Sequence, residues 1–564
     1  MKQGNLMKAF NGQQMAWVFG LTAWLQLLGA VPARAVPVTS TNISQLPGAC
    51  EAMADVDFSK DLDAPTHISD AQLIVSTPGL LGDVGIPAMP ALAALAVRHI
   101  GPIHPYCRVR GYVAASVGFE LLLPTTNWNG KFLHVGCAGW CGTLGHVGLG
   151  CARHPGYACI GTDMGHRGTG GLALANNLQA QVDFSYRATH VATLAGKALT
   201  ERFYGSRPKK SYFIGCSTGG YQGLVEAQRY PWDFDGIVAG APDMDESDLA
   251  VRSIWIKQNF MGPDEKPILN SSEIQLLHEA ALAQCDLDDG LKDGIISDPL
   301  HCGFDPATLL CKDKKTRQCL NPQQVRAVKN IYGVPVNSRG VVLSTRGVLP
   351  GSELSWEQSF AHVWGESYFE DMQLLSPPGT PWNYRDFNFD TDVKRSGVGV
   401  LFPSANPDLR EFDRAGGKLI TYQGTNDTAE IPGAVFDYYE TVQHTLGGRR
   451  ITEEFYRHFA VPAMDHCTGG DGAFSVDYLS YMERWVEEGH PPEVMIGVHI
   501  DGLQKSEGFV LNAKPDPDAT VRFTRPLYPY PQYARYSGHG DPNKAENFEP
   551  VTGSTGVLRD IENR

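Results

Sequence analysis

Short apolar runs alternate with helix-periodic stretches along the chain between residues 113 and 241. The predicted strands are 132–135, 157–160, 211–214 and 234–238, and the predicted helices are 182–203 and 221–229. In the longer helix, Leu194, Ala198 and Leu199 recur on one apolar face. Strands that alternate with helices and end next to glycines favour a parallel sheet covered on both faces. The pattern therefore predicts an α/β fold.

The alternation stops in the middle of the chain and resumes later. The intervening residues hold an acidic cysteine-rich loop, several tryptophans and Pro377-Pro378, and strands are predicted again at 418–422 and 455–461. An insertion into one domain, lying over the strand ends where such folds bind ligands, explains this order. The expected parts are a discontinuous catalytic domain, 36–243 and 406–564, and a lid domain, 244–405. The proline- and tyrosine-rich tail after about residue 500 is expected to be irregular surface chain.

The N-terminus has the order of a secretory signal peptide. Lys2 and Lys8 precede an apolar stretch over 16–31, and Ala33-Arg34-Ala35 follows it, so residues 1–35 are expected to be removed before Val36. An uncleaved membrane anchor is the alternative, which polar and glycine positions inside the stretch weaken. No other apolar run reaches the roughly 18 residues that span a bilayer. We therefore expect a secreted or periplasmic protein that does not act on membranes.

The charge balance argues against acidic partners. The 564 residues carry a formal net charge of −15, and the loss of Lys2, Lys8 and Arg34 with the signal peptide would make it −18. A chain this acidic is a poor candidate for binding nucleic acid or anionic lipid.

The 12 cysteines are an even number and follow an export signal, which predicts disulfides formed in an oxidising compartment. The absence of any C-x-x-C pair argues against a metal–thiolate site. The pairing of Cys137, Cys141, Cys151 and Cys159 stays open at this point.

A nucleophile elbow, G-x-S-x-G, stands at 215–219 between a predicted strand and a predicted helix. In α/β-hydrolases the catalytic order is serine, then an acid, then histidine. Ser217 is the candidate nucleophile, Asp427 the acid after strand 418–422, and His466 the base after strand 455–461. The sequence therefore predicts an α/β-hydrolase core with a large inserted lid.

Other interpretations of these residues remain. Asp427 could cap the following helix, and Cys216 could itself be a thiolate nucleophile, although it lies beside the apex of the elbow. His166 is a rival base, but it precedes the serine and is better suited to line the site. Asp465 has no strand end of its own and is expected to be solvated.

Ser217 and His466 each have a cysteine neighbour, Cys216 and Cys467. If these two cysteines are bonded, the nucleophile and the base are joined although 251 positions separate the cysteines. Such a cross-link would restrict the unfolded chain by about 5 kcal/mol in the loop-entropy model. Two unpaired buried thiols are the alternative.

Acyl transfer also needs N–H donors for the developing oxyanion. The residue after the nucleophile, Thr218, supplies one. The other is expected from the oxyanion loop, which we define as residues 136–142, Gly-Cys-Ala-Gly-Trp-Cys-Gly. Gly139 is the first choice and Ala138 the second, and a loop shaped only for folding is the alternative.

The acidic loop, residues 285–295, offers four carboxylates interrupted by glycines, Asp286, Asp288, Asp289 and Asp293. Hard oxygen donors in irregular geometry suit calcium, although the register is not that of an EF-hand. A solvated acidic turn is the alternative.

With these motifs the chain resembles the tannase/feruloyl esterase family of secreted α/β-hydrolases. The signature stands here as Cys216-Ser217, Asp427 and His466-Cys467, and the likeness extends through 127–130, 162–166, 211–217, 234–242, 285–295, 321–325 and 528–534. The resemblance implies a structural Ca²⁺ in the lid, held by the side chains of Asp286, Asp289 and Asp293 and the backbone carbonyls of Leu291 and Ile295. It also implies three further disulfides, Cys50–Cys107, Cys285–Cys302 and Cys311–Cys319.

The activity that the resemblance implies is hydrolysis of esters of aromatic acids through an acyl-serine intermediate, without a redox cofactor. The substrates would be small feruloyl-type esters, attached in some cases to plant polysaccharide or polyphenol, with gallate esters (tannase) as the alternative. Hydrolysis of a terephthalate monoester is less favoured, because no cysteine follows Cys467 and Glu430 occupies a position that is aromatic in that relative. A non-catalytic binding protein and a peptidase or acyltransferase on the same scaffold are the other hypotheses. Cys137 and Cys141 interrupt a loop that is often all glycine in relatives, which leaves the second oxyanion donor open.

Overall fold

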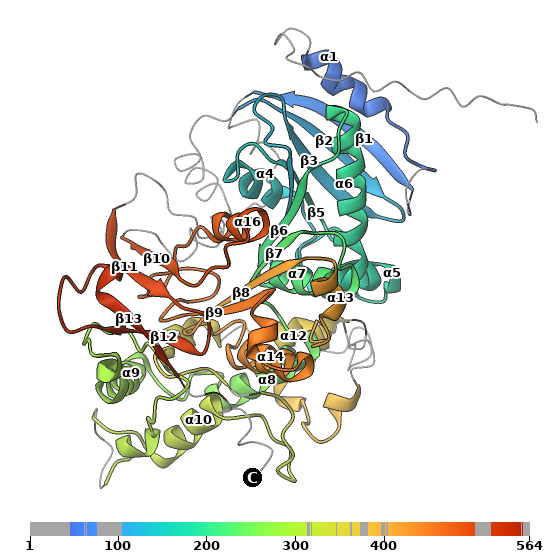
Figure 1. Cartoon of the computed structure of the whole chain (residues 1–564). Helices are drawn as coiled ribbons and strands as arrows, with labels where there is room; N and C mark the ends of the chain where they lie inside the picture. The colour runs from blue at the N-terminus through green and yellow to red at the C-terminus, as the bar shows by residue number, and fades with distance from the viewer. Residues whose placement is uncertain are drawn as a thin grey trace, which may run out of the picture. The chain divides into compact units, whose positions relative to one another are not determined.

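A nine-stranded mixed sheet organises the molecule (Figure 1). The computed structural model describes residues 46–60, 63, 65–75, 104–312, 316, 318–345, 347–360, 364–372, 382–395, 401, 404–501, 520–553 and 555. The expected signal peptide lies outside these residues. The strands are β1 (Thr66–Ile74), β2 (Tyr106–Val113), β3 (Val117–Pro124), β4 (Lys131–Val135), β5 (Ala158–Thr162), β6 (Lys210–Cys216), β7 (Gly236–Gly240), β8 (Lys418–Gly424) and β9 (Tyr456–Val461), in the order β1-β2-β3-β5-β4-β6-β7-β8-β9.

The prediction of a parallel sheet is correct for one part of this sheet and wrong for the other. The neighbours β5, β4, β6, β7, β8 and β9 are all parallel, whereas β1, β2, β3 and β5 pair antiparallel. The reason is the tight connection between β2 and β3, where Val113 pairs with Val117. A connection this short can only join antiparallel strands.

Side chains of the central strands alternate between two buried clusters. Phe132 and Phe213 lie in the cluster that includes residues of α6 (Ala188–Tyr204) and α7 (Thr218–Arg229). Leu133 and Ile214 lie in the cluster that includes residues of α4 (Gly145–Ala152) and α16 (Tyr478–Glu488). Because successive residues of a strand face opposite sides, both faces of the sheet are covered, as expected. This is the arrangement of an α/β-hydrolase.

The chain between β7 and β8 forms the region expected as the lid. Its main helices are α8 (Glu246–Phe260), α9 (Ser271–Cys285) and α10 (Pro322–Tyr332), followed by the short α11 (Trp356–Ser359) and α12 (Trp364–Ser367). Asn270 and Asn321 begin α9 and α10 with capping boxes, which satisfy the first free N–H groups of each helix.

The expectation of an irregular tail is wrong. Strand β10 (Met495–Ile500) pairs antiparallel with β11 (Val521–Leu527), and β12 (Gln532–Tyr536) pairs with β13 (Phe548–Thr552). Of the prolines that suggested irregular chain, Pro526 lies in β11, an edge strand of a two-stranded sheet, where a proline without an N–H is tolerated. Pro529 and Pro531 lie in the connection between β11 and β12. Within the described part of the chain, no helix has both the length and the apolarity needed to cross a bilayer.

Six disulfides use all 12 cysteines. The four expected pairs are present: Cys50–Cys107, Cys216–Cys467, Cys285–Cys302 and Cys311–Cys319. The four cysteines whose pairing was open form Cys137–Cys141 and Cys151–Cys159.

Candidate active site

Three parallel strands deliver the three candidate catalytic residues to one edge of the sheet. Ser217 directly follows β6, Asp427 follows β8 by three residues, and His466 lies in the loop after β9. Since the carboxyl ends of parallel strands lie at the same edge, the topology brings together residues that are far apart in the sequence.

The elbow around Ser217 is tightly packed backbone. Ser217 has φ 63° and ψ −127°, a conformation that a residue with a side chain rarely adopts. A Cβ on Gly215 would lie 2.6 Å from the carbonyl oxygen of Gly219, and a Cβ on Gly219 would lie 2.9 Å from that of Cys137. Both glycines of the motif are therefore required by close approach, and α7 begins at Thr218.

Asp427 both caps its own loop and holds His466. Its Oδ1 accepts hydrogen bonds from the N–H groups of Ala429 and Glu430, each at 2.9 Å. Its Oδ2 lies 2.9 Å from His466 Nδ1 and accepts a hydrogen bond from Gln423 Nε2 at 3.0 Å. The carboxylate is fully buried, so these donors replace water. The helix-cap interpretation is wrong, because the next helix, α14 (Gly433–Leu446), has Pro432 at its N-cap position and no side-chain cap.

The charge around His466 favours its protonated form. Burial alone would lower the pKa of His466, but the charge and hydrogen bond of Asp427, with smaller contributions from Glu430 and Asp465, raise it above the ordinary 6.5. A base with a raised pKa accepts a proton more readily, which suits abstraction of a hydroxyl proton.

The Cys216–Cys467 disulfide connects the elbow to the histidine loop. The two Cα atoms are 5.9 Å apart, and His466 Nε2 lies 3.7 Å from Cys467 Sγ. The edge of the imidazole that does not face Asp427 is therefore next to the sulfur bridge, one residue away from Ser217. Cys216 is bonded, which excludes the thiolate interpretation.

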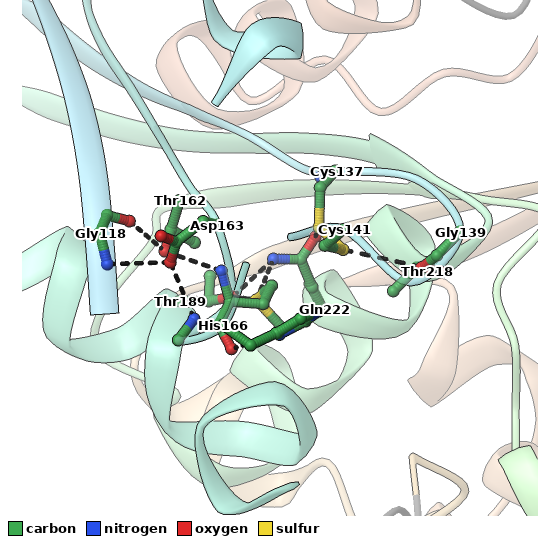
Figure 2. The surroundings of a disulfide bond; sticks show 12 residues. Gly118, Cys137, Gly139, Cys141, Thr162, Asp163, His166, Thr189, Thr218 and Gln222 are labelled. Carbon is green, nitrogen blue, oxygen red and sulfur yellow. Dashed lines mark hydrogen bonds between the residues drawn. A yellow bond between two sulfur atoms is a disulfide. The ribbon is translucent and has the colours of Figure 1, made fainter. Parts of the chain in front are cut away.

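The candidate oxyanion donors also lie close to one another (Figure 2). The N–H of Thr218, the first residue of α7, has no partner within its helix because of its position. The Thr218 hydroxyl donates a hydrogen bond to the Gly139 carbonyl at 2.7 Å. Among the described residues, no hydrogen-bond acceptor is found for the Gly139 N–H. Ala138, the second choice, has its carbonyl engaged by the Cys141 N–H at 3.1 Å.

The structure contradicts the expectation for Asp465 and agrees with the one for His166. The expectation that Asp465 is solvated is wrong: it is 9% exposed and accepts a hydrogen bond from Ser355 Oγ in the lid at 3.3 Å. The segment between β7 and β8 reaches this strand end through Ser355, which no local sequence feature predicts. His166 is buried against Phe184, its Nδ1 is 3.4 Å from the Met164 carbonyl, and no described contact joins it to Ser217, which agrees with a lining role.

Sequence reasoning missed the lid residues that border the oxyanion loop. Trp140 of the loop stacks on Trp364 of α12, with ring centroids 3.9 Å apart and planes 13° apart. Trp364 Nε1 donates a hydrogen bond to Glu246 Oε2 at 2.6 Å. Glu246 belongs to a group of buried carboxyl groups with Asp243 and Glu430, and burial raises the pKa of Glu246 to about 8. Acidic residues directly after strand β7 were the available signal.

The comparison with known families shows to which family this chain belongs. The family model described as tannase and feruloyl esterase matches residues 97–551. The chain belongs to the tannase and feruloyl esterase family. It is a carboxylic ester hydrolase of the feruloyl esterase or tannase type, acting on small ester substrates.

Individual members of the family give the degree of similarity. Mono(2-hydroxyethyl) terephthalate hydrolase of Piscinibacter sakaiensis is 33% identical over 537 residues, covering 81% of this chain and 86% of the relative. Probable feruloyl esterase B-2 of Aspergillus terreus is 31% identical, covering 79% of this chain and 86% of the relative. The crystal structure of feruloyl esterase B from Aspergillus oryzae matches with a TM-score of 0.73 and 26% identity, covering 89% of this chain and 100% of that chain.

The acidic loop of this tannase and feruloyl esterase family member crowds its carboxylates. Asp286 Oδ1 accepts from the Gly294 N–H at 3.1 Å, and Asp289 Oδ2 accepts from Ser297 Oγ at 2.5 Å. Burial, with the charges of Asp293 and Asp286, raises the pKa of Asp289 to about 6. Asp293 pairs with Arg525 at 2.6 Å. Neighbouring carboxylates, of which Asp289 has a raised pKa, fit a site that a cation completes.

The backbone of this loop fits the same interpretation. Among the described residues, no donor is found for the carbonyls of Leu291 and Ile295. The carboxylate oxygens of the acidic loop are, however, not the most closely spaced group of possible metal ligands among the described residues. In the part of the chain that the structure describes, the group whose ligand atoms all lie within 4.8 Å of one another is His190, Glu226 and Asp233, between α6 and the end of α7. There, His190 Nδ1 already bonds Asp233 at 2.6 Å.

Proposed function

We propose that Ser217, His466 and Asp427 are a catalytic triad that hydrolyses esters of hydroxycinnamic acids through an acyl-serine intermediate. The observation that carries this proposal is the Asp427–His466 pair, joined to the elbow serine by the Cys216–Cys467 disulfide at the ends of parallel strands. Among the activities that the family supports, a feruloyl-type esterase is the one proposed here.

The geometry supports the following order of events. Asp427 holds His466 with its Nδ1 turned toward the carboxylate. Nε2 then takes the Ser217 proton as the hydroxyl attacks the ester carbonyl. The N–H groups of Thr218 and Gly139 stabilise the oxyanion of the tetrahedral intermediate. His466 returns the proton to the departing alcohol, and water, activated by the same histidine, releases the acid from the serine.

The surroundings of the triad support an aromatic acyl group without a second carboxylate. Trp140 follows the proposed oxyanion donor Gly139 and stacks on Trp364, so aromatic side chains lie next to the proposed site of reaction. Three carboxyl groups, Asp427, Glu430 and Asp465, influence the pKa of His466. The cation Arg252 near Glu430 already pairs with Asp248 at 3.0 Å. A substrate with its own carboxylate would add negative charge beside this group of carboxyl groups.

Two further candidate substrates are retained for specific reasons. The 33% identity to the terephthalate monoester hydrolase supports testing that ester, although the carboxyl groups argue against it. Gallate esters are the alternative because their phenolic hydroxyls can donate hydrogen bonds to carboxyl groups. For any of these acids, the alcohol would be a small alcohol or a hydroxyl of plant polysaccharide or polyphenol. Six disulfides support an exported location for such an enzyme.

We further propose that the acidic loop binds a structural Ca²⁺. Asp286, Asp289 and Asp293 would hold it through their side chains, with Leu291 and Ile295 through their carbonyls. The ion would offset the repulsion between these carboxylates and so stabilise the lid. It has no part in the chemistry proposed for Ser217.

The test of the proposed function is a substrate panel. Methyl ferulate, methyl gallate, chlorogenate and a terephthalate monoester are compared by kcat/KM. Amide substrates and alcohol acceptors are tested alongside, because they would detect a peptidase or an acyltransferase. The proposal expects the hydroxycinnamate esters to rank first and hydrolysis to exceed transfer. A higher kcat/KM for the terephthalate monoester would contradict the substrate assignment. Failure of folded wild-type protein to hydrolyse any ester would favour a non-catalytic binding protein.

A further inference from the structure

A short disulfide, Cys137–Cys141, closes a ring inside the oxyanion loop (Figure 2). The two Cα atoms are 5.5 Å apart and each cysteine is 3% exposed, so the bridge is buried in the protein. The ring encloses Ala138, Gly139 and Trp140. Since Gly139 is the proposed second oxyanion donor, the shape of this ring determines where that N–H points. The following inference rests on the proposed function.

Within the ring, the backbone makes a tight turn. The Cys141 N–H donates a hydrogen bond to the Ala138 carbonyl at 3.1 Å. Gly139, the first central residue, has φ 57°, and Trp140 is not among the residues of positive φ. This is the pattern of a type II′ turn, which favours glycine at the first central position. Because the Ala138 carbonyl points into the turn, the Gly139 N–H of the same planar peptide points out of it.

Cys141 is strained in this turn. It has φ 57°, in the left-handed region that residues with a side chain rarely adopt. The ends of the oxyanion loop are fixed separately. The Cys137 N–H donates to Gln222 Oε1 at 3.0 Å, and the Gly142 N–H donates to the Asp163 carbonyl at 3.1 Å. The disulfide is the covalent link that closes the tip between these two anchors.

The turn has contacts on two sides. The Gly139 carbonyl accepts the Thr218 hydroxyl at 2.7 Å, which links it to the residue that supplies the other oxyanion donor. The Trp140 ring stacks on Trp364 of the lid. If Cys141 relaxed to an ordinary conformation, the Gly139 peptides would rotate, and both the hydrogen bond to Thr218 and the direction of the Gly139 N–H would change.

We propose that the Cys137–Cys141 disulfide is a positioning element of the reaction: it holds the strained turn in which the Gly139 N–H, together with the Thr218 N–H, faces the developing oxyanion. Ground-state binding of the substrate does not depend on these two donors to the same extent, because the charge they receive appears only in the transition state.

The first experiment removes the bridge without leaving a free thiol. The Cys137→Ala/Cys141→Ala variant is expected to lose about tenfold or more in kcat toward methyl ferulate, with KM within about threefold of wild type. The matched control is Cys151→Ala/Cys159→Ala, which removes another buried bridge of short separation between α4 and β5. This control is expected to lower Tm while keeping the wild-type kcat. A kcat within about threefold of wild type in the folded Cys137→Ala/Cys141→Ala variant would overturn the proposal.

The second experiment tests the strained residue. Glycine adopts φ 57° without steric cost, so Cys137→Ala/Cys141→Gly is expected to recover part of the lost kcat relative to the alanine pair. Equal kcat values for the two variants would overturn the role given to the conformation of residue 141.

Two measurements keep the inference testable on its own. If the bridge variants do not fold, Thr218→Val keeps the backbone N–H and removes the hydroxyl that holds the Gly139 carbonyl, and it should lower kcat with little change in KM. An unchanged kcat in this variant would contradict the inference.

Ester hydrolysis by the wild type is measured first. Its absence would refute the proposed function, whereas an active wild type with fully active variants refutes only the positioning role.

Discussion

The loops at the strand ends and the acidic loop are both energetically unfavourable, the first because of backbone conformation and the second because of neighbouring carboxylates. At the strand ends, Cys141, Ser217 and Cys467 have φ of 57°, 63° and 64° although all three carry side chains. In the acidic loop, the residues of positive φ are Gly290 and Gly294, and the carboxylates are crowded instead. The first region holds backbone strain and the second holds charge.

The difference teaches what stabilises each region. Two of the strained residues are half-cystines, and Ser217 follows a third, so covalent cross-links hold the strained loops in register. Strain at positions of this kind is typical of functional sites. In the acidic loop, the proposed Ca²⁺ would offset the repulsion between the carboxylates instead. The following predictions separate the two kinds of support, beginning with the largest effect.

Ser217→Ala removes the attacking oxygen from the strained elbow. We expect kcat to fall by about 10⁵-fold or more, as for other serine hydrolases, because no other group can form the acyl intermediate. Alanine is smaller than serine, so Tm and the circular dichroism spectrum should match the wild type. Residual turnover above one hundredth of wild type would contradict the assignment of the nucleophile.

Asp427→Asn removes the charge that orients His466. We expect kcat to fall by about 10⁴-fold. The pH profile of kcat/KM gives a second readout. Neutral His466 is the active base, so activity of the wild type should rise with pH through a midpoint above 6.5, the ordinary pKa. Without Asp427 the pKa falls, and the midpoint should move to lower pH. A midpoint that stays in place would mean that another group controls the profile.

Cys216→Ala/Cys467→Ala breaks the link between the nucleophile and the base. In the loop-entropy model its removal costs up to about 5 kcal/mol of unfolding free energy, and displacement of the imidazole should lower kcat by about 10²-fold. The control, Cys311→Ala/Cys319→Ala, removes a lid bridge of separation 8 and should cost about 2.5 kcal/mol with kcat unchanged. Denaturant unfolding and steady-state kinetics measure both. Equal kcat in the two variants would remove the functional role of the Cys216–Cys467 bridge.

Chelation of calcium should affect the lid and spare the chemistry. Addition of calcium at one hundred times its Kd is expected to stabilise the protein by about 2.7 kcal/mol, with kcat at 25 °C unchanged. Asp289→Asn should abolish this gain, whereas Asp288→Asn, at an exposed position outside the proposed ligand set, should keep it. A chelated protein with an unchanged Tm would contradict the cation site.

The sequence predicted the strand-end site more fully than its surroundings. The strand before Ser217 and the strands before Asp427 and His466 were visible as apolar runs, and parallel topology brings their ends together without further information. The burial of Asp465 and the Trp140–Trp364 stack depend on how the lid folds over the sheet, which local pattern does not encode. Strand β11 and the chain around it were missed because Pro526, Pro529 and Pro531 resemble irregular chain.

The measurement that tests the account most directly is active-site labelling followed by peptide mapping. Wild-type protein is treated with a fluorophosphonate and the modified residue is located by mass spectrometry, with ester hydrolysis followed in parallel. The account predicts one phosphonyl group, on Ser217, acquired at the rate at which hydrolysis is lost, and found in a peptide that the disulfide joins to the one containing His466. Folded protein that hydrolyses esters while Ser217 stays unlabelled would contradict it.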